Sequence, residues 1–569
     1  MTAGIQKKWV IADVLPSEVD SALADFPPAF RQILYNRGVR TMSDAIQFLH
    51  PDLSATYDPF LLTGMEDAVR DILAAIDRHE LIAVYGDYDV DGVTATTLLV
   101  EVLQKLGGDA IGYIPNRFDE GYGLHPEAMH QLFERGVKLV ITVDCGIRSN
   151  AEVIYAQELG MRVIISDHHT PLGELPPTTV ICQKQVEDTY PFKDLAGVGL
   201  AYKIAAGLFA IRPQEGISAE DWLDLVALGT VADILPLKGE NRVLVRKGLD
   251  KIRTGSRQGL RALAGVSKVD IQKALSSHIG FALGPRLNAA GRRESAMAAL
   301  DLLLETDVEK ASLLAQQLDD QNRERQVLTQ EIQQRALDEL SKAPLDDILF
   351  YFDTEEHFSK MSGVVGLAAA RLTEMHYRPS VVGCIGPDTT RASCRSIPEF
   401  HITEALDECS DLLVHHGGHA MAAGFTVLNK NMPELQERLR QISRARLKGL
   451  DLQPLLKVDM VIPLTELHPS LLDAMAALEP TGLGNPEPIY ACRGLRVQRA
   501  KTVGNQDQHL KMTVTDGTIS YDAIGFRQGH WLSHLPQRID IVFTFEMNQF
   551  NGFSSLQLNV RDIRDSSKS

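Results

Sequence analysis

Three short apolar segments, each followed by acidic residues, constrain the fold of this chain more than any other feature. The segments are 81–86 (LIAVYG), 137–143 (VKLVITV) and 162–166 (RVIIS), and amphipathic stretches separate them. Apolar runs of this length that alternate with helical stretches predict βαβ units and a buried parallel sheet. Because the carboxyl ends of parallel strands share the edge where ligands bind, the residues that follow the segments should converge.

Those converging residues are mostly carboxylates and imidazoles. The motifs GDYDVDG, VDCG and SDHH follow the three segments and supply Asp87, Asp89, Asp91, Asp144, Asp167, His168 and His169. Oxygen ligands with one or two imidazoles suit Mn²⁺ or Mg²⁺, and a pair of such ions supports in-line displacement at phosphorus. Asp233, in the apolar run LGTVADILPL, needs a partner cation if it is buried. The sequence therefore predicts a divalent-metal centre for phosphoester chemistry.

Two other interpretations of these motifs are weaker. An isolated Asp at the end of a strand more often caps a helix or turn, but the recurrence of the pattern argues against that role for the whole set. DYDVDG also matches the opening of a calcium-binding EF-hand loop. That loop needs Glu at its twelfth position, where this chain has Leu98, and a helix in place of the preceding apolar strand.

Length, charge and cysteine content exclude several classes of protein. The 569 residues suggest three to four domains, no apolar run is long enough to cross a bilayer, and the N-terminal residues lack the pattern of a secretory signal. Six cysteines without a CxxC pair argue against a zinc knuckle or a disulfide framework and favour a reducing cytoplasm. The net charge of −18 is modest evidence against a nucleic-acid partner, although metal-binding carboxylates also make a chain acidic.

The pattern of the remaining chain predicts an α/β multidomain protein. Residues 307–342 contain neither Gly nor Pro and have leucines at helical spacing, which indicates a long connecting helix. Short alternating runs after residue 455 indicate a small β-barrel or sandwich. The expected divisions are an N-terminal helical segment, a catalytic domain, the connecting helix, a second α/β domain and the barrel, at residues 1–50, 51–300, 301–344, 345–450 and 451–569.

Taken in their order and spacing, GDYDVDG, VDCG, DHH and GTVAD resemble the four signature motifs of the DHH phosphoesterase family. Further motifs resemble the single-strand-specific exonucleases of that family: PNRFDEGYGL (115–124), GPRLNAAGR (284–292), RASCRSI (391–397), GGHAMAAGF (417–425) and LEPTGLGNPEP (478–488). The resemblance implies a parallel-sheet DHH domain, a connecting helix, an α/β DHHA1 domain and a C-terminal OB-type barrel. It also implies 5′-to-3′ release of mononucleotides from single-stranded DNA, in DNA repair and recombination.

The resemblance also implies roles for individual residues. The implied ligands of two Mn²⁺ or Mg²⁺ ions, with Asp144 as the bridge and His169 close by, are Asp87, Asp89, Asp91, Asp144, His168 and Asp233. The implied contacts along the DNA strand are Arg117, Arg286, Asn288 and Arg292. The implied pocket for the terminal phosphate contains Arg395, Ser396, Gly417, Gly418 and His419. An arginine that only packs a helix or lies on the surface is an equal alternative at each such position, and a further metal site is an alternative for the HHGGH run (415–419).

Cations and aromatic residues in the last region suit a groove that follows a single strand. They are Arg493, Arg496, Arg499, Lys501 and Lys511, with Tyr490, Phe550 and Phe553. The slightly favoured alternative is that the aromatic side chains form the core of the barrel. Two positions depart from the family pattern: HFSKMSGVVG (357–366) lacks the usual Trp-His pair, and CQK (182–184) replaces Asn-Pro-Lys. The departures put substrate contacts in doubt and leave the metal centre intact.

Two competing functions come from the same family. A DHH-family oligoribonuclease or cyclic-dinucleotide phosphodiesterase is one, and the length and the C-terminal barrel argue against it. A non-catalytic, Cdc45-like replication scaffold is the other, and the complete set of ligand carboxylates argues against it. The family also suggests a helicase and a single-strand-binding protein as partners. We expect no membrane association and a monomer.

Overall fold

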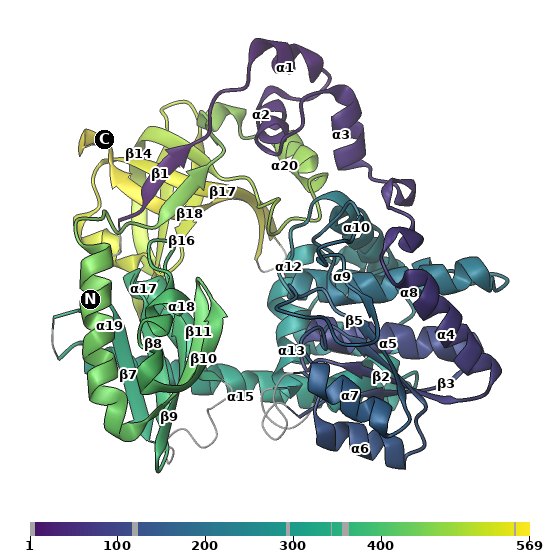
Figure 1. Ribbon diagram of the computed structural model, residues 1–569. Helices are drawn as coiled ribbons and strands as arrows, with labels where there is room; N and C mark the ends of the chain where they lie inside the picture. Colours follow the sequence, from purple (N-terminus) through teal and green to yellow (C-terminus); the bar gives the residue numbers. More distant parts are fainter. Residues whose placement is uncertain are drawn as a thin grey trace. The chain divides into compact units, whose positions relative to one another are not determined.

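The computed structural model describes residues 6–116, 123–291, 296–342, 344–354, 364–550 and 553–568. The chain forms two compact units. Unit 1 comprises residues 1–42, 324–476 and 488–569, and unit 2 comprises residues 43–323 and 477–487. Unit 2 contains the acidic motifs, whereas unit 1 contains the second α/β region and the C-terminal strands (Figure 1).

A five-stranded parallel sheet lies at the centre of unit 2. Its strand order is β3-β2-β4-β5-β6, with β2 (Leu81–Gly86), β3 (Asp109–Tyr113), β4 (Leu139–Val143), β5 (Arg162–Ser166) and β6 (Thr179–Ile181). β2, β4 and β5 confirm the three predicted strands. β3 and β6 are the edge strands, and neither has the continuous apolar run that identifies a central strand.

Helices cover both faces of this sheet because alternate strand residues face opposite sides. Ile82 and Val84 of β2 belong to a core cluster with α4, α5 and α8, whereas Ala83 and Tyr85 belong to a cluster with α6 and α7 (Figure 1). The helices of unit 2 are α4 (Met65–Asp77), α5 (Val90–Lys105), α6 (Pro126–Glu134), α7 (Asn150–Glu158), α8 (Gly197–Ile211), α9 (Leu223–Ala232), α10 (Gly239–Thr254), α11 (Gln258–Ser267), α12 (Ser276–His278), the π-helix η5 (Ile279–Leu283), α13 (Gly284–Ala290) and α14 (Met297–Leu304).

The LEPTGLGNPEP motif belongs mostly to unit 2, although it is distant in sequence. Arg242 donates hydrogen bonds to the carbonyls of Leu478 (3.0 Å) and Pro480 (3.2 Å), and Arg246 donates one to the carbonyl of Glu479 (2.6 Å). Two guanidinium groups of α10 therefore hold this loop against unit 2.

The long helix α15 (Val308–Leu340) confirms the predicted connecting helix, and its residues belong to both units. Unit 1 contains a mixed sheet of order β10-β11-β9-β8-β7, in which only β7 and β8 are parallel. Its strands are β7 (Leu349–Thr354), β8 (Ser380–Ile385), β9 (Thr389–Arg395), β10 (Leu413–His419) and β11 (Ala422–Leu428), and its helices are α17 (Val365–His376), α18 (Ile402–Asp407) and α19 (Met432–Leu447).

The C-terminal strands of unit 1 form a closed barrel, because β14 pairs with both β15 and β17. The barrel strands are β14 (Tyr490–Val503), β15 (His509–Thr515), β16 (Ser520–Gly525), β17 (Arg538–Phe550) and β18 (Phe553–Asp565). Other elements of unit 1 are β1 (Lys8–Ile11), β12 (Leu455–Val458), β13 (Met460–Val461), α1 (Ser17–Ala22), α2 (Pro28–Asn36) and α20 (Pro469–Ala476). The helix α3 (Met42–Leu49) belongs to unit 2 apart from its first residue. Tyr490 lies in the barrel core.

No helix among the described residues has both the length and the hydropathy to span a membrane. All six cysteines are free thiols.

Candidate metal centre

The strand register of unit 2 brings the acidic motifs together. Gly86 pairs with Val143, and Val143 pairs with Ser166, so the next residue of each strand leaves the sheet at the same edge. Potential ligand atoms lie within 4.8 Å of one another in three overlapping groups: Asp144 with His168 and His169; Asp91 with His168 and Asp233; and Asp87 with Asp89 and Asp144. The structure therefore brings together the six implied ligands and His169.

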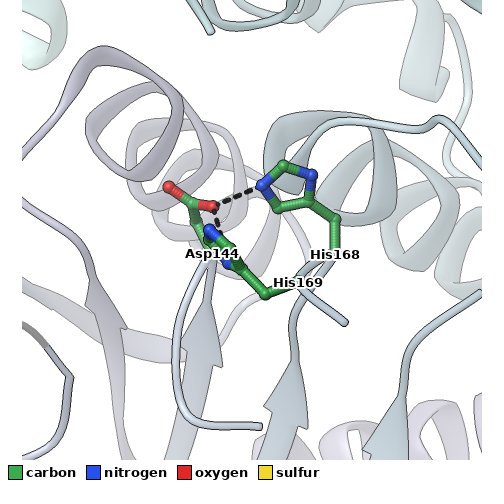
Figure 2. Close-up of side chains that lie close together, drawn as sticks. All are labelled: Asp144, His168 and His169. Atoms are coloured by element: carbon green, nitrogen blue, oxygen red, sulfur yellow. Dashed lines mark ion pairs between the residues drawn. The ribbon is translucent and has the colours of Figure 1, made fainter. Parts of the chain in front are cut away.

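Asp144 belongs to two of these groups, and its carboxylate lies close to both His168 and His169 (Figure 2). Its Oδ1 lies 3.0 Å from Nε2 of His168 and 3.9 Å from Nδ1 of His169. The backbone of Asp144 is in the left-handed region, with φ of 62°. A residue with a Cβ adopts this conformation only at a cost in free energy, and such strain is common at functional sites. The turn after β4 thus directs the carboxylate toward both imidazoles.

Helix termini position two further carboxylates. Asp89 caps α5, because its Oδ1 accepts hydrogen bonds from the backbone N–H groups of Asp91 (2.9 Å) and Gly92 (3.1 Å). Asp91 accepts hydrogen bonds from the N–H groups of Gly197 (2.6 Å) and Val198 (2.8 Å) at the N-terminus of α8. Asp89 therefore does cap a helix, as the alternative interpretation of an isolated Asp predicted. It also belongs to the cluster of potential metal ligands.

Asp167 plays a supporting role. Its carboxylate accepts hydrogen bonds from the N–H groups of Ile147 and His169, both at 3.0 Å, and lies 2.8 Å from Nδ1 of His169. It belongs to none of the three groups of potential ligands. Asp167 therefore fixes the orientation of the His169 ring, as partners of metal-binding histidines commonly do. The position after a strand does not by itself distinguish Asp167 from Asp87 and Asp144, which also follow strands.

Glycines give the backbone room to approach the carboxylates. A Cβ at position 197 would lie 2.6 Å from Cβ of Asp144, and a Cβ at position 229 would lie 3.0 Å from Oδ1 of Asp91. A Cβ at position 92 would lie 2.4 Å from the carbonyl oxygen of Asp87. Gly229 begins the GTVAD motif but was given no role of its own, and Gly197 lies in none of the quoted motifs. The signal for Gly197 was the run AGVGLAYK, in which glycines begin an apolar helix.

The electrostatics of the cluster favour a bound cation. Burial, followed by repulsion from neighbouring carboxylates, raises the pKa of Asp91 and of Asp144 well above the usual value. The same causes raise the pKa of Asp233 to about 7, and burial lowers the pKa of His168 to about 3. A neutral imidazole and crowded carboxylate oxygens are a suitable donor set for a divalent ion, which would offset the repulsion. These residues fit Mn²⁺ or Mg²⁺.

The CQK departure lies beside this cluster. Gln183 is buried and donates hydrogen bonds to the carbonyls of Lys193 (3.2 Å) and Leu195 (2.9 Å), which precede α8. The positive charge of Lys184 lowers the pKa of His168 and opposes the rise in the pKa of Asp233. Sequence reasoning assigned no role to Lys184. Most of the other departure, HFSKMSGVVG, lies outside the described residues.

The predicted contacts along the DNA strand are only partly described. Arg286 on α13 forms an ion pair with the buried Asp319 (2.8 Å) and donates a hydrogen bond to the carbonyl of Ala282 (2.8 Å). Asn288 lies half-buried on the same helix. Arg117 and Arg292 lie outside the described residues. The guanidinium of Arg286 therefore has a helix-packing role, whatever else it contacts.

The predicted phosphate pocket belongs to the mixed sheet of unit 1. Arg395 pairs with Ala422 and Ala422 pairs with His419, so Arg395 and His419 are level across three strands. Gly417 and Gly418 precede His419 on the edge strand β10 and are exposed. Ser396 is buried, and its hydroxyl donates to the carbonyl of Phe400. Among the described residues, the groups with metal-ligand spacing contain no histidine of the HHGGH run.

The barrel presents cations on its surface. Arg493, Arg496 and Arg499 are exposed, and Arg499 lines a shallow hollow of about 450 Å³ with Lys501 and Lys511. The side chains of Phe550 and Phe553 lie outside the described ones. A second hollow of about 700 Å³ was not predicted from the sequence, and it is lined in part by Phe526, Trp531, His534, Arg527 and Arg561.

Comparisons with known proteins agree with this geometry. Family models match the chain over residues 81–230 (DHH family, N-terminal domain), 349–445 (DHHA1 domain) and 458–562 (RecJ OB domain). The single-stranded-DNA-specific exonuclease RecJ of Bacillus subtilis (strain 168) is 38% identical over 540 residues, which cover 94% of this chain and 68% of that protein.

Two solved structures are similar over 98% of this chain. The crystal structure of RecJ in complex with Mn²⁺ from Thermus thermophilus has a TM-score of 0.84 and 30% identity, and 79% of that chain is covered. The crystal structure of RecJ in complex with Mg²⁺ from the same organism has a TM-score of 0.78 and 28% identity, with 78% of that chain covered.

Proposed function

Because the chain belongs to the RecJ family of single-stranded-DNA-specific exonucleases, we propose that it removes mononucleotides from the 5′ end of single-stranded DNA by metal-dependent hydrolysis. The observation that carries the proposal is the convergence of acidic and imidazole side chains from four separate segments at one edge of the unit 2 sheet. Phosphodiester hydrolysis by paired divalent ions requires such a donor set.

The three overlapping groups of ligand atoms support a site for two ions. Asp144 belongs to two groups and His168 belongs to two, so each could serve a pair of adjacent ions. The remaining members of the groups are Asp87, Asp89, Asp91, His169 and Asp233. When bound, Mn²⁺ or Mg²⁺ would activate a water for attack on phosphorus and stabilise the charge on the leaving oxygen.

The residues of the chain set the geometry of the reaction. The N–H groups at the start of α8 hold the Asp91 carboxylate, and Asp167 holds the His169 ring. His168 stays neutral because burial lowers its pKa to about 3, so its Nε2 lone pair is available as a donor near neutral pH. Preorganised donors of this kind need no rearrangement when charge develops on the phosphate.

Unit 1 supplies a suitable environment for the 5′ phosphate. Gly417 and Gly418 let an anion approach the exposed edge of β10, and the guanidinium of Arg395 suits phosphate oxygens. The cations of the barrel suit the phosphate backbone of a single strand.

The experiment that tests the function measures Mn²⁺-dependent release of nucleotides from a 5′-phosphorylated single-stranded oligonucleotide. A blunt duplex and an RNA dinucleotide are the comparison substrates, and end labels at 5′ or 3′ report the polarity. Asp144→Ala should abolish release, whereas Asp77→Ala, which changes an exposed carboxylate of α4, should not. Full activity of the Asp144→Ala variant, or release from the 3′ end, would contradict the proposal.

Several expectations from the sequence stay predictions. They are the division of the chain at residues 50, 300, 344 and 450, a cytoplasmic location, a monomeric state, and a helicase and a single-strand-binding protein as partners.

A further inference from the structure

Ile234, the residue directly after Asp233, has a backbone conformation that its side chain opposes. Its φ is +58°, in the left-handed region. It ends α9: the N–H groups of Ile234 and Leu235 donate hydrogen bonds to the carbonyls of Val231 (3.2 Å) and Thr230 (3.4 Å). Glycine usually occupies this position after a helix, since it has no Cβ, and a β-branched residue is the least favourable choice.

Packing does not explain why an isoleucine is present there. The residue is 69% exposed, so its side chain contributes little to the core of unit 2. A glycine at this position would relieve the backbone strain. The core of unit 2 would lose little packing with it, because the isoleucine side chain is mostly exposed. A strained residue next to a candidate metal ligand is therefore an indication that its side chain contacts something outside unit 2.

A second exposed apolar side chain lies on a segment that packs against the same helix end. A Cβ at Gly280 would lie 3.9 Å from Cγ1 of Val231, and a Cβ at Gly284 would lie 3.4 Å from Cβ of Ala232. Between these glycines, the π-helix η5 carries Phe281, which is 87% exposed. Short π-helices are rare and frequently occur at functional sites.

The segment that begins with η5 also borders the acidic motif. It continues directly into α13, and just after the end of α13 a Cβ at Gly291 would lie 2.7 Å from the carbonyl oxygen of Tyr88. Tyr88 stands between Asp87 and Asp89. The segment 279–291 therefore runs from the end of α9, where Asp233 lies, to the loop that carries the first carboxylates.

We propose that Ile234 and Phe281 form an apolar surface that contacts the unstacked nucleobases next to the scissile phosphate. This inference rests on the proposed function, because it takes single-stranded DNA as the occupant. Every base has a π face, so stacking on Phe281 and apolar contact with Ile234 hold the strand without selecting its sequence. Neither residue is a metal ligand, and both act on binding and register of the strand.

The test compares Ile234→Gly and Phe281→Ala with the wild type on two substrates. One is an ordinary 5′-phosphorylated oligonucleotide, and the other carries abasic sites at its first nucleotides. Loss of one base contact should raise KM for the ordinary strand about 10-fold. On the abasic strand the variants and the wild type should have equal kcat/KM, because no base is present to contact.

Folding and metal binding are measured on the same variants. Ile234→Gly should have a Tm equal to or above that of the wild type, since it relieves the strain, and an unchanged affinity for Mn²⁺. Leu313→Ala, which truncates an exposed leucine of α15, is the control and should leave KM unchanged. Phe281→Trp should retain tight binding, because the larger ring also stacks.

Three results would overturn the inference: an unchanged KM for both variants, an equal loss on the abasic strand, or a lower Tm that accounts for the loss. A wild-type protein that releases no nucleotide would instead contradict the proposed function, so the two failures are distinguishable.

Discussion

The sheets of the two units place the candidate functional residues in opposite environments. In unit 2, Asp91 and Asp144 are 1% and 2% exposed, and burial with mutual repulsion raises the pKa of both. In unit 1, Gly417, Gly418 and His419 lie exposed on an edge strand. Buried carboxylates cost folding free energy unless a cation compensates, so their presence itself indicates a metal. Exposed glycines and an exposed histidine cost little folding free energy. Their presence alone therefore does not indicate which ligand they bind.

The first prediction concerns the close packing around the buried cluster. Gly197→Ala should lower kcat/KM by about 100-fold or more, because the new methyl group would displace the Asp144 carboxylate and a shift of about 1 Å has an effect of that size. Steady-state kinetics on single-stranded DNA measures it. The matched control is Gly265→Ala on α11, where a Cβ meets nothing within 4 Å, and its kcat/KM should not change. Equal kinetics of the two variants would show that the cluster tolerates displacement.

The exposed site in unit 1 should respond more weakly and only to the end group of the DNA. Arg395→Gln should raise KM about 10-fold for a 5′-phosphorylated strand, the size expected for one charged hydrogen bond, and leave KM for a 5′-hydroxyl strand unchanged. Arg391→Gln changes an exposed arginine of the same strand and should alter neither KM. An equal effect of Arg395→Gln on both substrates would show that this site does not bind the 5′ phosphate.

A third prediction concerns the pH dependence of stability in the buried cluster of unit 2. In metal-free protein the raised pKa of Asp233, about 7, means that the native state holds a proton that the unfolded state releases near pH 4. This stabilisation is complete below the unfolded pKa and is lost as the pH rises through 7. The contribution of Asp233 to the free energy of unfolding, taken as the difference between the wild type and Asp233→Asn, should therefore fall by about 1 kcal/mol between pH 6 and pH 8. His168, whose pKa burial lowers to about 3, is present in both proteins, so its opposite contribution cancels in that difference.

Urea unfolding of protein treated with a chelator measures this change. Both proteins are measured at pH 6 and at pH 8, and saturating Mn²⁺ should reduce the pH dependence of the difference between them, because the cation takes the place of the proton. In the metal-free proteins, a difference that stays constant or grows in favour of the wild type from pH 6 to pH 8 would contradict the assigned direction of the pKa shift.

The smallest effect on DNA binding is expected at Arg286. Its guanidinium is already bound to Asp319, so Arg286→Gln should change KM for DNA less than about 3-fold. The free energy of unfolding should fall by about 1–3 kcal/mol, because a buried carboxylate loses a charged partner. A larger rise in KM without a loss of stability would show that Arg286 contributes more to DNA binding than to helix packing.

The buried site was predictable from the sequence because its physical constraints are local. A run such as LVITV followed by Asp144 determines both a strand and the edge at which its carboxylate lies. The same holds for Asp87 and for His168. The long helix α15 was predictable for a similar reason, because helical spacing without Gly or Pro leaves few alternatives.

What the sequence did not reveal depends on contacts between distant segments. Gly197 supports Asp91 and Asp144 from more than 50 residues away, and the strained φ of Ile234 has no sequence signal at all. Asp167 and Arg286 show that residue type and position in the sequence do not by themselves define a role. Both had the residue type expected of a site, and only the structure shows that one orients His169 and the other pairs with Asp319.

Anomalous diffraction from crystals soaked in Mn²⁺ tests the metal assignment most directly. We expect two manganese peaks, with the Asp144 carboxylate and Nε2 of His168 within about 2.5 Å of one or both ions, and no peak at the HHGGH run. Crystals that bind manganese elsewhere, with no peak beside Asp144, would contradict the assignment.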